Sequence, residues 1–398
     1  MNKKLVSVHA CEDYNADRVN AAVRAAIDDL GGIAKFVKAG QRVFIKVNLV
    51  MAALPEKCIT THPNVVAAVA RLVKEAGATP IIGDSPGGSY NKGFVGGVYR
   101  KSGMLAMADA LGFELNDDFS DTEADFPDGV VAKKIPILGA LDKADVIINV
   151  AKLKTHTFTG YSAAVKNMYG AIPGLVKIQW HSYYQELPRF ANCLVDINEY
   201  FRGQGKLVLH VVDAVDGMEG PGPTAGTPVH IGAILASECQ YSLDSVCVRI
   251  MGDNPVEMPI LTTAAERGLL NPNYETDLAG DPIEQFINKK YKTMPPSNFQ
   301  SAVKSPLVRW LIRRVFSVRP VVSKRKCKGC RKCHDHCPAE AITMHERKPN
   351  PVARFDYNKC IRCFCCQELC PFSLIKIKRP LVAKFLARAR RKKSKPQK

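Results

Sequence analysis

Nine of the chain's 14 cysteines lie between Cys327 and Cys370, and eight of them form two copies of one motif. The copies read Cys327-x2-Cys330-x2-Cys333-x3-Cys337-Pro338 and Cys360-x2-Cys363-x2-Cys366-x3-Cys370-Pro371. Two-residue gaps let three thiolates converge from one tight loop onto three corners of a cubane, while the fourth ligand comes from the other copy. The spacing therefore predicts two [4Fe–4S] clusters. One is bound by Cys327, Cys330, Cys333 and Cys370, and the other by Cys360, Cys363, Cys366 and Cys337.

Structural zinc is the competing interpretation of these cysteines. Zinc sites generally use paired C-x2-C knuckles, which do not explain a third cysteine at the same spacing in both copies. Clustering within one segment also indicates metal binding in a reducing compartment rather than a disulfide framework. Cys365 has no place in the motif and is expected to be a small packed side chain. The remaining cysteines have no ligand spacing and are expected to be buried structural residues: Cys11, Cys58, Cys193, Cys239 and Cys247.

The motif segment, about residues 321–379, resembles bacterial two-cluster ferredoxins, and this resemblance implies a small α+β domain. It departs from them in the longer stretch His345–Asn358, which is expected to form a hairpin extension. The preceding residues 1–293 are predicted to form an α/β ligand-binding domain. Residues 294–320 are predicted to be a linker with a basic amphipathic segment, and residues 380–398 a basic tail.

The first 290 residues alternate between short β-rich runs and amphipathic helices, which predicts a mostly parallel sheet with flanking helices. Several strands read as near-continuous apolar runs, as strands covered on both faces do. The expected helices include Ala16–Leu30 and Pro63–Ala76, with Pro63 in the first helical turn and His62 as a helix-start contact. The expected strands are Leu5–Ala10, Arg42–Val50, Thr79–Asp84, Ala144–Lys152, Lys206–Val215 and Ile231–Ala236.

Open parallel sheets bind ligands at the carboxyl ends of their strands, and polar residues gather at these ends here. We predict an anion-binding set of Lys46, Asn48, Lys152, Lys166 and Asn167, and a catalytic set of Lys154, His156, Asp84, Asp213 and Asp216. The turn Gly83–Gly88 exposes backbone N–H groups that can cradle an anion, and Gly220–Pro228 is expected to be a shaped binding loop. The alternatives are an edge position for Lys46, an ordinary strand–helix connection at Gly83–Gly88 and a solvated basic loop at Lys152–His156.

Several short motifs resemble a family catalogued as domain of unknown function 362, which is often fused to a ferredoxin module. They are Lys46-Val47-Asn48, Thr61-His62-Pro63, Gly83-Asp84-Ser85-Pro86, Lys152-Leu153-Lys154-Thr155-His156, Lys166-Asn167 and the run from Asp213 to Pro221. The resemblance covers about Val43 to Ser242. It implies an iron–sulfur protein and leaves the reaction and substrate open.

Two functions fit these features. In the first, an oxidoreductase passes electrons between the clusters and an anionic ligand held by the α/β domain, with His156 or an aspartate moving protons. In the second, the chain is a non-enzymatic electron carrier or maturation factor whose N-terminal domain docks a partner protein. Clusters with a purely structural role are a third, weaker possibility. No Gly-x-Gly-x-x-Gly or Walker motif is present, so a flavin or other organic cofactor has no motif support.

The formal charge of +18 predicts an acidic redox partner, an anionic small molecule or an anionic membrane surface. No recognised nucleic-acid-binding motif accompanies this charge. The N-terminal apolar run ends at Cys11, too early for a signal peptide, so a cytoplasmic location is expected. In the tail, Leu381, Val382, Phe385, Leu386 and Ala389 fall on one helical face. This pattern suits a peripheral contact at the inner face of a membrane, or packing of the tail against its own protein.

Overall fold

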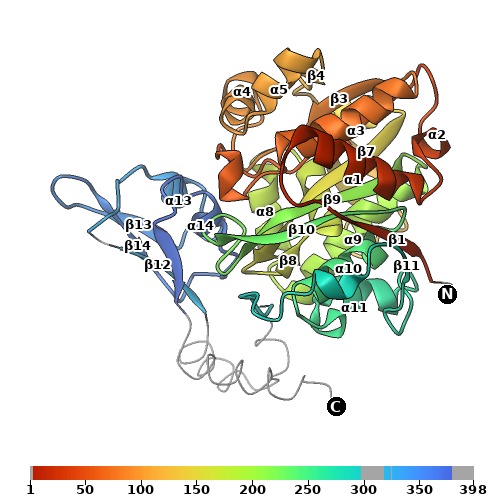
Figure 1. Ribbon diagram of the computed structural model, residues 1–398. Coiled ribbons are helices and arrows are strands. Elements are labelled where there is room, and N and C mark those ends of the chain that lie inside the picture. The colour runs from red at the N-terminus through yellow and green to blue at the C-terminus, as the bar shows by residue number, and fades with distance from the viewer. Residues whose placement is uncertain (1–2, 297–317, 324, 379–398) are drawn as a thin grey trace.

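The computed structural model describes residues 3–296, 318–323 and 325–378. They form an α/β domain around a nine-stranded sheet and a small ferredoxin-type module that lies at one side of it (Figure 1). Most of the predicted linker and the whole basic tail lie outside the described residues. Within the described ranges, no helix is long and apolar enough to cross a bilayer.

The large sheet is mixed but mostly parallel, as predicted. Its order is β11 (Asp277–Gly280), β1 (Leu5–Ala10), β10 (Thr227–Ser237), β9 (Leu207–Glu219), β7 (Val146–His156), β2 (Arg42–Lys46), β3 (Thr79–Gly83) and β4 (Glu114–Leu115), with β8 (Gly160–Ser162) paired to β7. Strand β7 is parallel to both β2 and β9, and β2 is parallel to β3. Strand β10 is antiparallel to β9 and β1. The carboxyl ends of β2, β3 and β7 therefore meet at one edge.

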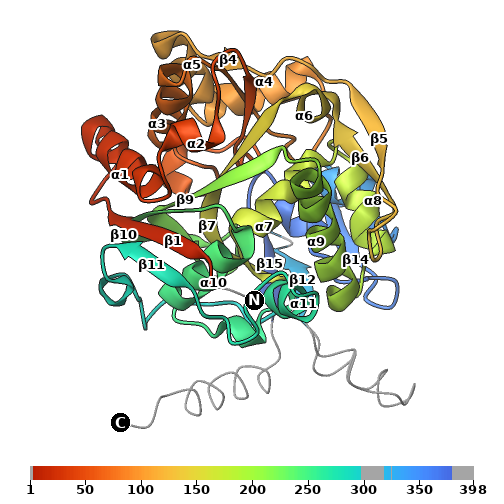
Figure 2. The same cartoon turned by 90° about the vertical axis from the view of Figure 1, so that its right-hand side faces the viewer.

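Helices cover both faces of the sheet (Figure 2). One hydrophobic core lies under α1 (Ala16–Asp28), α2 (Ile33–Phe36), α3 (Pro63–Glu75), α4 (Lys92–Lys101) and α5 (Met104–Leu111). The start of α3 is confirmed: Pro63 opens the helix, and Nδ1 of His62 accepts a hydrogen bond from the Asn64 amide. Short 3-10 turns lie at η1 (Pro55–Lys57), η2 (Met168–Ala171), η3 (Pro255–Glu257) and η4 (Ile283–Gln285).

The second core fills the opposite face of the sheet. It is covered by α7 (Ala164–Asn167), α8 (Val176–Tyr183), α9 (Leu187–Gly203), α10 (Gln240–Ile250) and α11 (Pro259–Glu266), together with the hairpin β5 (Asp121–Asp125) and β6 (Lys134–Leu138) and the short α6 (Gly139–Lys143). All eleven residues of β7 are buried between the two cores. Burial on both faces explains the mainly apolar first half of this strand, Val146–Ala151.

Two predicted strand boundaries differ from the structure in the region that builds the site. The strand expected at Arg42–Val50 ends at Lys46, because the Asn48 amide bonds to Thr61 Oγ1 instead of a neighbouring strand. The strand expected at Ala144–Lys152 continues to His156, because its end pairs with β8 in a hairpin. The first change takes Asn48 out of the regular sheet, and the second keeps Lys154 and His156 within it, paired with β8.

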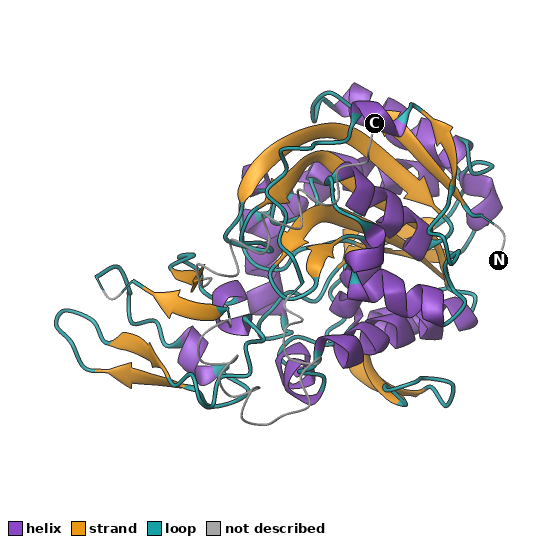
Figure 3. Cartoon of the chain, turned by 90° about the horizontal axis from the view of Figure 1, so that it is seen from below, coloured by secondary structure: helices purple, strands orange, loops and turns teal. Residues whose placement is uncertain are grey.

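The module contains two antiparallel strand pairs and two short helices (Figure 3). They are β12 (Arg319–Val322) with β15 (Ile375–Lys378), β13 (Ile342–His345) with β14 (Val352–Phe355), and the helices α13 (Lys332–Asp335) and α14 (Cys365–Glu368). Helix α14 contacts the α/β domain through the fully buried Gln367, whose Nε2 donates to the Pro221 carbonyl at 2.7 Å. The loop expected to be a binding loop at Gly220–Pro228 thus contacts the module.

Candidate functional site

Thiols of the predicted cluster-binding motifs lie close enough to influence one another's ionisation. Burial and the neighbouring thiols of Cys330, Cys327 and Cys370 raise the pKa of Cys333 to about 12. Burial is the main cause that raises the pKa of Cys366. The charges of Cys363 and Cys360 raise it further, and those of Cys333 and Cys337 add a smaller effect. Thiols crowded in this way resist ionisation until a cation stabilises them, which is the role that iron plays in a cluster.

The second set surrounds a space of its own. Cys337, Cys360, Cys363 and Cys366 together line a cavity of about 20 Å³ inside the module. Four cysteines that converge on one enclosed space are the donor set that a cubane requires. The residues of the module therefore fit [4Fe–4S] ligation, with the fourth thiol supplied across the two copies of the motif.

A larger cavity, of about 100 Å³, lies where the carboxyl ends of β2, β3 and β7 face α14 of the module. Six of the predicted site residues line it: Asn48, Asp84, Lys154, His156, Lys166 and Asn167. Helix α14 contributes Cys365, Glu368 and Leu369 to the same wall. We call this space the inter-domain cavity. Its volume is far below the several hundred cubic ångströms that a flavin-sized ligand needs, so it suits a small molecule.

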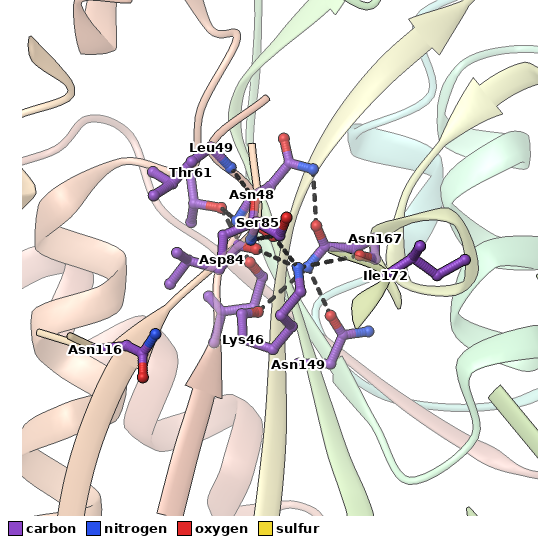
Figure 4. Close-up of polar contacts among 12 residues, drawn as sticks. Lys46, Asn48, Leu49, Thr61, Asp84, Ser85, Asn116, Asn149, Asn167 and Ile172 are labelled. Carbon is purple, nitrogen blue, oxygen red and sulfur yellow. Dashed lines mark hydrogen bonds and ion pairs between the residues drawn. The ribbon is translucent and has the colours of Figure 1, made fainter. Parts of the chain in front are cut away.

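The base of the cavity is a buried ion pair between Lys46 and Asp84 (Figure 4). The Lys46 ammonium lies 2.5 Å from Asp84 Oδ1 and also donates to the carbonyls of Val47 and Asn167. Asp84 accepts two backbone N–H groups, from Leu49 at 2.7 Å and from Ser85 at 2.8 Å. All three protons of the Lys46 ammonium are used and Asp84 accepts three hydrogen bonds, so this pair positions the turn after β3 and leaves little capacity for a ligand.

The side-chain amides of Asn48, Asn149 and Asn167 lie beside the ion pair (Figure 4). Asn48 links this chain of amides to Lys154. Asn48 Nδ2 donates to Asn167 Oδ1 at 2.7 Å, and Asn167 Nδ2 donates to Asn149 Oδ1 at 2.7 Å. Asn48 Oδ1 then accepts from the Lys154 ammonium, which also donates to the Ile59 carbonyl at 2.7 Å. These partners are neutral, so burial lowers the pKa of Lys154 to about 7, with Lys152 and Lys166 adding to the effect.

Lys177, a residue that the sequence analysis missed, supplies a second cation of this kind. Its ammonium donates to Ser85 Oγ at 2.8 Å and to the Ile172 carbonyl at 3.0 Å. Burial lowers its pKa to about 7, although the Asp84 charge acts in the opposite direction. Lys177 and His181 are four residues apart in α8 and so project from one face of that helix into the cavity. Only this i, i+4 spacing could have indicated them.

Lys166 differs from the other lysines of the cavity. Its ammonium lies over the Tyr169 ring, 4.5 Å from the ring centroid, and 5.7 Å from the centroid of Phe190. Among the residues that the structure describes, it has no hydrogen-bond or ion-pair partner. Burial lowers its pKa, and the charge of Glu368 in the module partly offsets this shift. An ammonium without an acceptor beside a cavity is a ready site for an anion.

His156 is held in one tautomer. Its Nδ1 accepts from the amides of Phe158 and Thr159, at 3.2 and 3.4 Å, so the ring proton resides on Nε2. Nε2 lies 3.4 Å from Glu368 Oε1 without the geometry of a hydrogen bond, and both atoms are buried. Burial lowers the pKa of His156 well below its ordinary value, with Lys166 as the next cause. The ring is therefore a neutral donor aimed toward the cavity, rather than a group that changes charge near neutral pH.

Three predicted site residues lie elsewhere. Lys152 pairs with Asp213 at 3.0 Å and donates to Tyr14 Oη at 2.5 Å, forming a closed buried cluster. The same Asp213 carboxylate accepts from the His62 amide at 2.9 Å. Asp216 instead contacts the half-exposed His230. Strand β9 lies beside β7 with Asp213 opposite Lys152, two residues before the part of β7 that reaches the cavity.

Comparison with known proteins places both parts of the chain. Residues 43–249 match the family described as "Domain of unknown function (DUF362)", and residues 326–374 match the "4Fe-4S dicluster domain". A thylakoid-associated protein of Synechocystis is 35% identical over 273 residues, covering 68% of this chain and 81% of that protein. Pyruvate synthase subunit PorD of Methanocaldococcus jannaschii is 35% identical over 57 residues, which cover 14% of this chain and 63% of that subunit.

Two solved structures are also similar. The lactate racemase apoprotein of Thermoanaerobacterium thermosaccharolyticum aligns with a TM-score of 0.36 at 15% identity, covering 58% of this chain and 53% of that one. A structural-genomics protein of Thermotoga maritima aligns with a TM-score of 0.30 at 13% identity, covering 55% of this chain and 54% of that one. The chain thus spans about half the length of each. The family match extends over half of the chain, so the chain belongs to the DUF362 family, and its dicluster domain supports iron–sulfur electron transfer.

Proposed function

We propose that this member of the DUF362 family is an oxidoreductase that exchanges electrons with a small anion bound in the inter-domain cavity. Two [4Fe–4S] clusters, when bound by the eight motif cysteines, supply single-electron transfer. The cavity borders both the α/β domain and the loop that carries the second set of ligands. The observation that carries the proposal is the ammonium of Lys166, which points to an anion because no acceptor in the described chain pairs with it.

The other residues of the cavity suit binding and protonation of such a ligand. Neutral His156 offers an Nε2–H donor, and Lys154 and Lys177 have pKa values near 7. A group with a pKa near the working pH can both hold a proton and release it, which reduction of most small molecules requires. Asp84 serves as a positioning residue, since its pairs with Lys46 and two backbone amides hold the turn that carries Ser85.

Binding of small anions to the cluster-loaded protein tests this proposal. The probes are formate, acetate, pyruvate, oxalate, phosphate, nitrite and sulfite, and the readouts are calorimetric affinity and reoxidation of the dithionite-reduced protein. We expect at least one probe to bind and Lys166→Met to weaken that affinity by about tenfold or more with unchanged iron content. Lys74→Met is the matched control, because its ammonium lies over the Phe113 ring on the surface. Equal affinity in wild type and Lys166→Met, or no binding of any probe, would sink the proposal.

We also propose that the basic tail at residues 380–398 contacts an anionic membrane surface. The apolar face of its sequence and its cluster of Arg and Lys support this idea. A relative named as thylakoid-associated is consistent with it. Sedimentation with phosphatidylglycerol vesicles at low salt compares the full chain with a chain ending at Arg379. Equal binding of the two would dismiss the role of the tail.

A further inference from the structure

The loop that carries the first set of cluster ligands has a surface of its own. Cys330 is solvent-exposed, whereas Cys363 at the equivalent position of the second copy is buried. Five exposed basic residues surround it: Arg325, Lys326, Lys328, Arg331 and Lys332. We call these five residues and Cys330 the basic loop surface. It lies in the module, which projects away from the body of the sheet (Figure 1).

The positive charge of this surface is only partly neutralised by the chain itself. Asp335 lies 3.5 Å from the Arg331 guanidinium and 2.8 Å from His334 Nδ1, and Glu340 is the other exposed acid of the loop. Among the described residues, the ammonium groups of Lys326, Lys328 and Lys332 have no ion-pair partner. An excess of cations at a surface steers an oppositely charged partner toward it and fixes the partner's orientation.

We infer that the basic loop surface docks an acidic one-electron carrier protein. The exposed ligand position at Cys330 marks the place where a partner's redox centre approaches the first cluster most closely. In the transfer itself, the reduced carrier loses one electron and this protein gains one, with no bond made or broken and no proton moved. A protein is the partner that fits, because five exposed cations spread over eight residues match a broad acidic face better than a small ion.

This docking surface lies beyond the proposed function, since it requires nothing of the inter-domain cavity. The two cysteine loops then have different roles in one path. The first loop meets the carrier, and the second loop borders the cavity through Cys365 and Glu368. Electrons that enter at the surface of the module are thereby directed toward the enclosed ligand, away from solvent.

Affinity for a defined acidic carrier tests the inference. The probe is an oxidised plant-type [2Fe–2S] ferredoxin of net negative charge, titrated calorimetrically into the cluster-loaded full chain at about 50 mM and about 300 mM salt. We expect Lys328→Glu combined with Lys332→Glu to weaken binding by about tenfold or more at low salt, and the difference to shrink at high salt. Iron content reports whether each variant keeps its clusters.

The matched control reverses two exposed lysines of the α/β domain, Lys38→Glu in the loop before β2 with Lys74→Glu near the end of α3. This pair changes the net charge equally, so we expect it to alter the affinity less than about twofold. Equal losses in both double variants would overturn the inference by showing a net-charge effect. Affinity that is insensitive to salt would overturn it as well. The inference would also be overturned if Lys328→Glu with Lys332→Glu kept its ferredoxin affinity but lost binding to phosphatidylglycerol vesicles, since the surface would then face a membrane. None of these results depends on whether Lys166→Met affects an anion.

Discussion

The two cysteine loops of the module have the same spacing and opposite surroundings. Arg331 and Phe364 occupy equivalent positions, and both adopt left-handed backbone geometry, with φ of 61° and 64°. Arg331 is exposed to solvent, whereas Phe364 is 2% exposed and belongs to the core of the α/β domain. The same holds for Lys332, which is exposed, and Cys365, which lines the cavity. Ligand geometry is thus repeated, while the residues between the ligands assign each loop to a different neighbour.

The largest effect is expected from the ligands themselves. Loaded wild-type protein should hold about eight iron per chain, and Cys333→Ala or Cys366→Ala should each lose about half or more. Cys365→Ala, at the position of Lys332, should keep the full iron content, because Cys365 falls outside the spacing of the ligand motif. Iron and sulfide analysis with the visible spectrum makes the measurement. Stoichiometric zinc without broad visible absorbance would contradict the cluster assignment for both loops.

Phe364→Ala and Arg331→Ala compare the packing of the two loops directly. Truncation of the buried ring should destabilise the docked module by about 3 kcal/mol, because it leaves a cavity in the core. Truncation of the exposed guanidinium should change stability by less than about 0.5 kcal/mol. Denaturant unfolding, together with limited proteolysis between the domains, measures both. Similar losses in the two variants would break the distinction between a buried and an exposed loop.

A smaller contrast is expected between Gln367 and His334, which also occupy equivalent positions. Gln367 Nε2 donates to the Pro221 carbonyl and its Oε1 lies 3.3 Å from Thr157 Oγ1. The His334 side chain, in contrast, has its one hydrogen bond within the described residues with its exposed neighbour Asp335. Gln367→Ala should therefore cost about 1–3 kcal/mol of docking, because it removes the hydrogen bond to Pro221 and the packing of a fully buried side chain. His334→Ala should be nearly neutral. Limited proteolysis between the domains compares the docking of Gln367→Ala and His334→Ala. A larger loss in His334→Ala would contradict the docking geometry.

The smallest effect separates the two binding surfaces by their response to pH. Burial lowers the pKa of Lys154 and Lys177 to about 7, and a bound anion favours their charged forms, so anion binding should take up protons. Affinity at the inter-domain cavity should be highest below pH 7 and fall above it by up to about tenfold per pH unit for each proton taken up. Ferredoxin affinity at the basic loop surface, to which neither Lys154 nor Lys177 belongs, should change little over pH 6–8.5. Calorimetry in buffers of different ionisation enthalpy measures the proton uptake, and an anion affinity that is flat with pH would contradict the assigned role of these lysines.

The sequence predicts those site residues that lie at the ends of strands recognisable from their apolar runs. Asn48, Asp84, Lys154 and His156 stand at or just beyond the ends of recognisable strands, and parallel pairing brings such ends together. Lys152 was grouped with them because it is only two residues from Lys154. The pairing of β7 with β9 places Asp213 opposite Lys152, and this contact draws Lys152 into a different cluster. Strand register is a long-range property that no local pattern specifies.

The sequence by itself determined the two cluster motifs, the α/β class of the first domain and the start of α3. Each depends on spacing over a few residues: thiol gaps, apolar periodicity, or a proline in the first helical turn. Only the tertiary structure decided that Lys166 and Glu368, 202 residues apart, border one cavity, and that Lys177 and His181 complete it. It also decided which of two similarly spaced cysteine loops is buried. The physical reason is that both outcomes depend on how the module packs against the sheet, and that packing is determined by side chains such as Phe364 and Gln367 on surfaces distant in sequence.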